Sequence, residues 1–126
     1  MMDLLAADEL LTTTRSVRKR LDLTREVSLD DVMECIEIAL QAPTGSNRQG
    51  WSFVVVTDPA KRSELARLYK DAITLYSQMP RPEYEAGDPR EASSVKVAES
   101  AWYLAEHLHE VPVILVPCIE GRVEEA

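Results

Sequence analysis

The chain has 126 residues, and 45% of them are hydrophobic, which is enough to build the core of one domain. Its formal net charge is −8 and its pI is near 4.7, which argues against nucleic acid as the main partner because Lys and Arg must neutralise phosphates. No apolar run approaches the ~18 residues of a membrane span, and the first residues lack the basic start and cleavage site of a signal peptide. We therefore expect a soluble, cytoplasmic protein with no membrane contact.

The first half of the chain predicts two helices. A short one covers residues 3–12, and the clearest one covers 29–41, where Ser28 and Asp31 resemble a capping box. Pro43 and Gly45 end the second helix. Its apolar residues recur at the spacing of one buried face: Leu29, Val32, Met33, Ile36 and Leu40.

A strand and a third helix follow. Residues 51–57, WSFVVVT, are rich in aromatic and β-branched types, and the consecutive valines predict a strand buried on both faces. Asp58 and Pro59 then provide a cap and a first-turn proline for a helix over 60–78. The residues expected on its inner side are Leu65, Leu68, Tyr69, Ile73 and Tyr76.

The segment 80–94, with three Pro and several charges, predicts a mobile loop. A helix over 95–109 and a second buried strand over 111–118 follow it. Two strands alone leave backbone groups without partners, so either another copy supplies further strands or this chain is the N-terminal portion of a longer domain. We favour the second explanation. The helix residues expected to face inward are Val95, Ala98, Ala101, Trp102, Ala105 and Leu108.

The cysteines and histidines predict no metal site. Cys35 and Cys118 each lie in an apolar run without a CxxC partner, so we expect buried thiols in a reducing compartment. His107 and His109 are two positions apart on a helix, so their side chains point about 200° apart and cannot chelate one ion. We interpret them as surface histidines.

The stretch RSVRKR, residues 15–20, concentrates positive charge in an acidic chain. Arg15, Ser16 and Arg18 offer two guanidinium groups and a hydroxyl, which could hold the phosphate of a small ligand. In an extended backbone, Ser16 and Arg18 would point to the same side. A solvated basic patch is the alternative interpretation.

The stretch APTGSNRQGW, residues 42–51, joins the second helix to the first strand. Gly45 has no side chain, so a flat ligand could approach its backbone closely. Asn47 offers both a donor and an acceptor, as the edge of a pyrimidine-like ring requires, and Thr44 could bond the same edge. An ordinary polar turn explains the same composition, because Pro, Gly, Ser and Asn are the usual turn residues.

The two stretches together, in this order, resemble the nitroreductase family of FMN-dependent flavoproteins. The pattern is R-S-x-R, an amphipathic helix, and then A-P-T-G-S-N-x-Q-x-W running into F-V-V-V. The resemblance covers residues 12–70 well and continues more loosely through the second strand. It implies an α+β fold, a nitroreductase-like α/β/α sandwich with helices around a mixed, mainly antiparallel sheet that is incomplete in this chain.

The resemblance also implies roles for individual residues. The first motif would hold the FMN phosphate and ribityl chain through Arg15, Ser16 and Arg18. The second would lie against the isoalloxazine ring of the cofactor held by the other subunit, while Gln49 and Trp51 support the loop and anchor the strand. The ring-contacting residues implied by the motif are Pro43, Thr44, Gly45 and Asn47.

Members of this family are intertwined homodimers with two FMN sites at the interface. The resemblance therefore implies an oxidoreductase that passes hydride from NADH or NADPH through FMN to a nitroaromatic, quinone or similar small-molecule acceptor. The flavin carries the chemistry, so no catalytic acid, base or nucleophile is named. The alternatives are a truncated, non-catalytic flavin-binding or dimerising protein, and a phosphate-binding module that uses only residues 15–20.

Three positions depart from the family pattern. Thr14 stands where many members have Arg, which removes one phosphate contact, Gly50 replaces a common Pro, and Leu21 replaces a common aromatic residue. The chain is also shorter than the family's usual domain. The remaining part of that domain would carry further strands, the contact to the hydride-accepting ring nitrogen, and basic residues of the phosphate site.

Overall fold

The computed structural model describes residues 4–121, which form helices and a small antiparallel sheet. The α+β class and every expected helix and strand are confirmed, although the helix expected over 95–109 begins six residues earlier and the strand expected over 111–118 begins three residues later. No helix within this part of the chain is long and apolar enough to cross a membrane. In chain order the elements are α1 (Leu4–Thr13), α2 (Leu29–Ala39), the short 3-10 helix η1 (Gly45–Asn47), β1 (Trp51–Val56), α3 (Pro59–Ser77), α4 (Pro89–His107), the short 3-10 helix η2 (Leu108–Glu110) and β2 (Ile114–Ile119).

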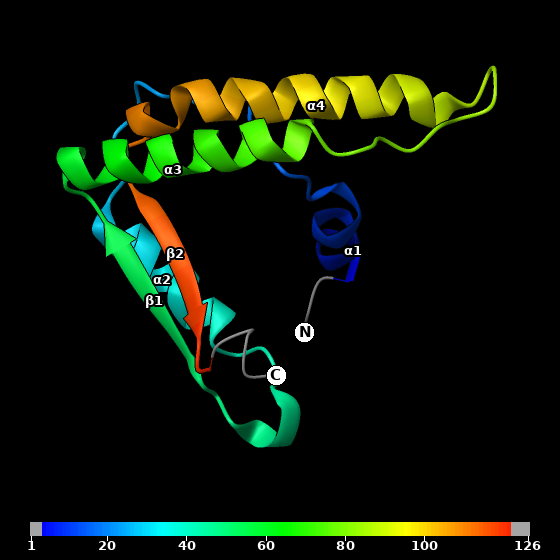
Figure 1. The fold of residues 1–126 in the computed structure, drawn as a ribbon. Coiled ribbons are helices and arrows are strands. Elements are labelled where there is room, and N and C mark those ends of the chain that lie inside the picture. The colour runs from blue at the N-terminus through cyan, green and yellow to red at the C-terminus, as the bar shows by residue number, and fades with distance from the viewer. Residues whose placement is uncertain (1–3, 122–126) are drawn as a thin grey trace.

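The sheet within the described residues consists of β1 and β2, paired antiparallel. The register runs from Trp51 opposite Ile119 to Val56 opposite Ile114. Pro117 lies inside β2 although it has no N–H to donate, which a strand with an open edge tolerates. Helices α3 and α4 connect the two strands, so this strand pair joins residues far apart in the sequence (Figure 1).

Helices α3 and α4 lie side by side across one end of the strand pair (Figure 1). Ala66 on α3 is only 5% exposed and Ala105 on α4 only 3%, and such small side chains allow two helices to pack closely. Together with Ile36 of α2, they are the buried apolar residues of the described chain. The core of residues 4–121 is therefore small and centred on this helix pair.

Helix α2 begins at a side-chain cap. The Ser28 hydroxyl accepts a hydrogen bond from the N–H of Asp30, at 3.2 Å. The capping box expected between Ser28 and Asp31 therefore forms only in part. Ser28 caps the helix, but it accepts from the residue two positions later rather than three. Of the expected buried face, Ile36 alone is buried, at 7% exposed, and Met33 is 49% exposed.

Helix α3 begins as its sequence predicts. The Asp58 carboxylate accepts a hydrogen bond from the N–H of Lys61 at 2.9 Å, and Pro59 occupies the first turn. A proline there loses no intrahelical bond because the first N–H groups of a helix have no partner.

Helix α4 begins at Pro89, so the loop expected over residues 80–94 is too long by six residues. Asp88 caps this helix by accepting a hydrogen bond from the N–H of Arg90 at 2.8 Å. The Asp-Pro pair at positions 88 and 89 therefore repeats the start signal of α3. The density of Pro and Gly around it obscured that signal in the sequence.

Arg62, in the first turn of α3, joins this helix to both strand connections. Its Nε donates to the carbonyl of Thr57 at 3.2 Å, before the helix. Its Nη1 donates to the carbonyls of Val111 and, at 3.5 Å, His109, which lie between α4 and β2. One half-buried guanidinium thus fixes the point where the chain leaves η2 for β2.

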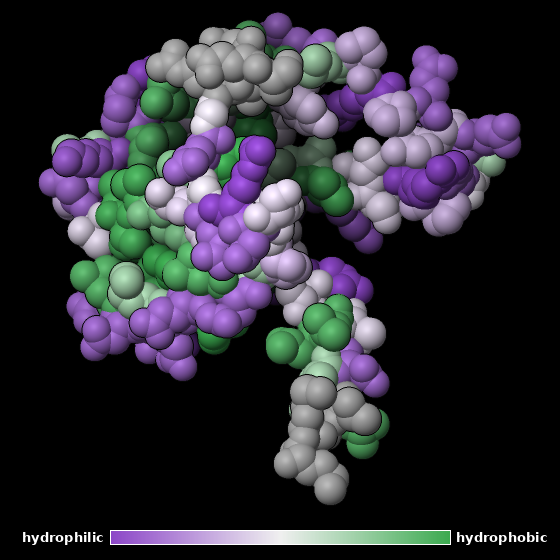
Figure 2. Space-filling view, turned by 90° about the horizontal axis from the view of Figure 1, so that it is seen from below, coloured by the Kyte–Doolittle hydropathy of each residue, from purple (hydrophilic) through white to green (hydrophobic). Residues whose placement is uncertain are grey.

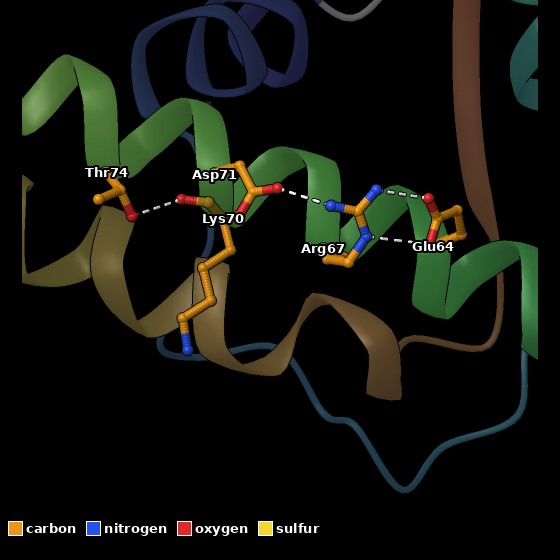
Figure 3. Close-up of polar contacts among 5 residues, drawn as sticks. All are labelled: Glu64, Arg67, Lys70, Asp71 and Thr74. Carbon is orange, nitrogen blue, oxygen red and sulfur yellow. Dashed lines mark hydrogen bonds and ion pairs between the residues drawn. The ribbon is translucent and has the colours of Figure 1, made fainter.

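The outer face of α3 carries a ladder of polar contacts (Figure 3). Arg67 donates to Glu64 one turn earlier, at 2.6 Å from Nη2, and to Asp71 one turn later, at 2.8 Å from Nη1. The hydroxyl of Thr74 donates to the carbonyl of Lys70 at 2.8 Å. These side chains are exposed, so we interpret the contacts as weak stabilisation of α3 itself rather than as a ligand site.

Much apolar surface remains exposed, including a broad hydrophobic area on the face seen in Figure 2. Monomeric soluble proteins rarely leave such continuous areas uncovered. Helix α1 stands apart from the strands and the helix pair in Figure 1, and three of its leucines are more than 65% exposed. The most exposed large apolar side chains, each at least 65% exposed, are Leu5, Leu10, Leu11, Ile38, Leu75, Tyr76 and Ile119.

Several expectations of burial are wrong for the described chain. Val54 in β1 is 50% exposed, so this strand is not covered on both faces. Cys35 and Cys118 are exposed free thiols rather than buried ones. Tyr76 and Val95, expected to face inward, are also exposed. Each pattern correctly marked an apolar position, but the described residues do not supply the neighbour that would cover it.

Candidate functional site

The basic motif lies in a segment without regular structure after α1, here called the cradle segment (residues 15–20). Helix α1 ends where the hydroxyls of Thr12 and Thr13 bond back to helix carbonyls, each at 2.6 Å in its shorter contact. A turn then forms, in which the N–H of Leu21 donates to the carbonyl of Arg18 at 3.2 Å. Residues 15–20 therefore belong to no strand, and the turn begins at Arg18.

The guanidinium groups of the cradle segment are available to an anion. Arg15 donates only to the neighbouring carbonyl of Thr14, at 2.7 Å, and Arg18 is half-buried. Within residues 4–121, neither guanidinium pairs with a carboxylate. Ser16, between the two arginines in the sequence, is also exposed.

An ion pair attaches the cradle segment to the helix pair. Lys19 Nζ lies 3.3 Å from Glu99 Oε2 on α4. Farther along, the Asp22 carboxylate accepts hydrogen bonds from the hydroxyl and the N–H of Thr24, and these bonds lower the pKa of Asp22. The first of these contacts was not anticipated, because nothing local in the sequence links position 19 to position 99.

The second motif forms a compact turn between α2 and β1, here called the elbow loop (residues 42–50). The N–H of Asn47 donates to the carbonyl of Thr44 at 3.0 Å, which closes η1. The Thr44 hydroxyl accepts from the N–H of Gln49 at 3.1 Å, and the Gln49 amide donates to the Asn47 side-chain oxygen at 3.1 Å. The interpretation of Gln49 as loop support is confirmed.

These bonds determine which groups of the elbow loop remain free. The Asn47 oxygen is occupied by Gln49, so the Asn47 NH₂ is left to donate outward. The Thr44 oxygen accepts from the backbone, so its proton is likewise free to donate. Trp51 begins β1 opposite Ile119 and is half-buried, which confirms it as an anchor of the strand.

The backbone of the elbow loop is unusual. Ser46, Asn47 and Gln49 adopt left-handed conformations, with φ of 54°, 52° and 48°. Such angles are uncommon for residues with side chains and tend to cluster where a loop serves a ligand. Gly45, in contrast, needs no special φ, and a Cβ there would meet nothing within 4 Å. Neither backbone angle nor crowding within the described chain requires glycine at this position.

The cradle segment and the elbow loop do not meet within one chain. In Figure 1 the connection from α1 to α2 passes behind α3 and α4, where Lys19 contacts Glu99, whereas η1 lies beyond the far end of β1. The cradle segment and the elbow loop therefore lie toward opposite ends of the strand pair (Figure 1). A single ligand contacting both groups would need one group from each of two chains.

The two histidines lie in different surroundings. Residues 4–121 contain no group of three His, Cys, Asp or Glu side chains that could hold an ion. His109 is exposed, as expected, whereas His107 is half-buried under Tyr103, with ring centroids 4.3 Å apart, and contacts Glu110.

Comparison with known sequences links these motifs to one family. A sequence model described as the nitroreductase family matches residues 11–126. A protein of Archaeoglobus fulgidus, provisionally named NADH dehydrogenase/NAD(P)H nitroreductase, is 31% identical to this chain over 72 residues. That match covers 57% of this chain and 38% of the relative.

Comparison with solved structures shows a shared fold. The crystal structure of the FMN and NADPH-dependent nitroreductase NfnB from Sphigopyxis sp. strain HMH matches with a TM-score of 0.51 at 23% identity. A mutant of the same enzyme matches with a TM-score of 0.52 at 25% identity. Both matches cover 88% of this chain but only 58% of the other. The chain thus spans less than two thirds of the length of these relatives.

Proposed function

Since the chain belongs to the nitroreductase family, we propose that it is an FMN-dependent oxidoreductase that passes hydride from NADH or NADPH through the flavin to a nitroaromatic, quinone or similar acceptor. The observation that carries this proposal is the availability of the two motifs. The cradle segment presents two guanidinium groups without carboxylate partners among the described residues. The elbow loop presents free amide and hydroxyl donors, is held by the hydrogen bonds of Gln49, and has three residues with left-handed backbone angles.

The described residues fit the cofactor at both of its ends. Arg15, Ser16 and Arg18 would hold the phosphate through charge-assisted hydrogen bonds. On the ring side, Asn47 and Thr44 would donate to acceptor atoms on the ring edge. A bound FMN supplies the redox chemistry, while the protein supplies position and electrostatics.

Pro43 and Gly45 would shape the ring side of the site. Pro43 fixes one backbone angle ahead of η1. Gly45 leaves open space where a Cβ would otherwise project, so a flat ring could lie against the backbone. This gives a reason for a glycine that no contact within the described chain explains.

The proposal includes a homodimer with the flavin between subunits. The two motifs lie toward opposite ends of one strand pair. Each cofactor would therefore take its phosphate contacts from one chain and its ring contacts from the partner. The exposed apolar surface of α1, α2 and the strands is available to form such an interface. The cytoplasmic location also remains a prediction.

A second candidate is a flavin-binding or dimerising protein without catalytic turnover. Flavin binding alone would need only the cradle segment and the elbow loop. The described residues contain both motifs.

Flavin titration tests the proposal. We expect the chain to bind FMN and quench its fluorescence, and the Arg18→Ala variant to bind at least about tenfold more weakly, as for loss of a hydrogen bond to a charged group. Arg25→Ala is the matched control, because Arg25 is an exposed arginine on the same connection but outside the cradle segment. An Arg18→Ala variant with unchanged affinity would contradict the assignment of the cradle segment.

Anaerobic addition of NADH or NADPH separates the two candidates. Loss of the flavin absorbance near its visible maximum, followed by recovery on adding a quinone or nitroaromatic compound, supports the oxidoreductase. Stoichiometric FMN binding without bleaching by either nucleotide supports the non-catalytic candidate instead.

A further inference from the structure

A hollow lies between the C-terminal half of α3 and the middle of α4, here called the α3–α4 pocket. Its volume is about 550 Å³, and the loop around Pro80 and Pro82 closes one end. Pockets for small molecules usually have volumes of about 300–1,000 Å³. Its main apolar lining comes from Ile73, Tyr76, Met79, Val97, Ala98 and Trp102.

The lining is suited to a flat ring. Tyr76 and Trp102 are aromatic, and rings pack well against other rings in offset or edge-to-face arrangements. Ala98 and Ala101 leave room on the α4 side. Met79 is unbranched and adapts to ligands of different outline.

One charged side chain lines this pocket. Arg81 lies on the closing loop and also lines a neighbouring, more polar depression with Glu83 and Glu91. Within residues 4–121, Arg81 forms no ion pair or hydrogen bond, even with those two acids. An apolar, aromatic hollow with a single unpaired guanidinium favours a ligand that combines an aromatic ring with an acidic group.

We propose that the α3–α4 pocket binds a one- or two-ring aromatic carboxylate, with the ring between Tyr76 and Trp102 and the carboxylate at Arg81. No residue of the cradle segment or the elbow loop lines it, so this site goes beyond the flavin proposal. Charge complementarity selects this occupant, because an apolar face of a second copy would leave the guanidinium of Arg81 without a partner.

Two-dimensional NMR of the ¹⁵N-labelled 126-residue chain, with no FMN added, tests the inference. The chain has two tryptophans, so it gives two indole N–H signals, assigned with the Trp51→Phe and Trp102→Phe variants. With 2-naphthoate as the probe, we expect the Trp102 signal to shift saturably. The Trp51 signal, from the start of β1, should stay in place.

Three variants test the ligand class. Arg81→Gln should weaken 2-naphthoate binding by about two- to fivefold, as for an exposed ion pair, and leave binding of the uncharged naphthalene-2-carboxamide unchanged. Lys96→Gln is the matched control, because Lys96 is an exposed cation on α4 outside the lining. Ala98→Leu should fill the pocket and abolish binding of both probes.

Three outcomes would overturn the inference: a shift that never saturates, equal shifts of both indole signals, or equal affinity of the Arg81→Gln variant and the parent chain. A Trp102 signal that does not respond to the probe, with dissociation of a dimer in the Ala98→Leu variant, would assign the pocket to a second copy instead. Because Arg81 is exposed, its variant still decides the question if Ala98→Leu does not fold. The flavin proposal can fail without affecting any of these results.

Discussion

Lys19 and Glu99, 80 positions apart in the chain, form an ion pair with a distance of 3.3 Å between Nζ and Oε2. Both side chains are at least half exposed, so the pair itself contributes little stability. Its consequence is positional, because it holds the cradle segment against α4, beside the arginines proposed to bind phosphate.

The Glu99→Gln variant separates positioning from simple charge. If Glu99 acts by positioning Lys19, this variant should bind FMN up to about fivefold more weakly in low salt. If only net charge matters, loss of a carboxylate near a phosphate site should strengthen binding. Flavin fluorescence titration at low and high salt distinguishes the two, since the positional effect should fade with screening.

Arg62 should be the most important single side chain for holding α3 to the strand connections. Replacing it with Met keeps the aliphatic stem but removes the donors to Thr57, His109 and Val111. We expect a loss of about 1–2 kcal/mol in the free energy of unfolding, because the bonds are charge-assisted but half exposed. Urea denaturation followed by circular dichroism measures it.

The neighbouring residue provides the control for Arg62. Lys61→Met removes an exposed cation of similar length one position away and should change stability by less than about 0.5 kcal/mol. Equal losses in the two variants would show that the guanidinium contacts do not hold the connection.

The start of α4 should make stability depend on pH. The side chain of Arg90, and then its backbone N–H, hold the pKa of Asp88 below its ordinary value. A carboxyl group with a lowered pKa in the folded state stabilises the protein above its unfolded pKa near 4, and this contribution is lost as the pH falls through the folded pKa. Acid should therefore weaken the α4 cap.

Two substitutions of Asp88 isolate this effect. Asp88→Asn can still accept from the N–H of Arg90, whereas Asp88→Ala cannot. The urea midpoint of Asp88→Asn should lie below that of the parent chain at pH 7 and approach it toward pH 3, and Asp88→Ala should stay lower at both. A gap between the Asn variant and the parent that is constant with pH would refute the linkage.

The leucines of α1 should contribute to self-association. Leu10 and Leu11 are 67% and 77% exposed, and burying each against a partner would contribute about 1.5–3 kcal/mol. Changing both to Ser should therefore weaken a dimer by about 100-fold or more. Sedimentation velocity over a dilution series measures the shift.

A polar change on the same helix is the control for the leucines. Glu9→Ser should leave the association unchanged, because Glu9 is an exposed polar residue. Monomers at every concentration of the parent chain would count against the homodimer itself, whereas a dimer unaffected by the double change would place the interface elsewhere.

The sequence correctly predicted features that depend on neighbouring residues. The Asp58 cap, the proline after it and the α2 periodicity are local signals, and the corresponding helices form where they indicate. The same signal at Asp88 and Pro89 was present but was masked by the surrounding Pro, Gly and charged residues. Even in the elbow loop, the supporting role of Gln49 followed from the motif, although its two bonds and the left-handed backbone did not.

The sequence by itself therefore determined the elements, their caps and the two polar motifs, because helix starts, turns and residue chemistry are set within a few positions. Only the tertiary structure decided that Val54, Cys35 and Cys118 are exposed. It also decided that Lys19 contacts Glu99 and that the two motifs lie toward opposite ends of the strand pair. Burial and long-range contact depend on which distant segments come together. Periodicity shows which apolar side chains share one face of a helix or strand. It does not show whether this chain or a second one covers that face.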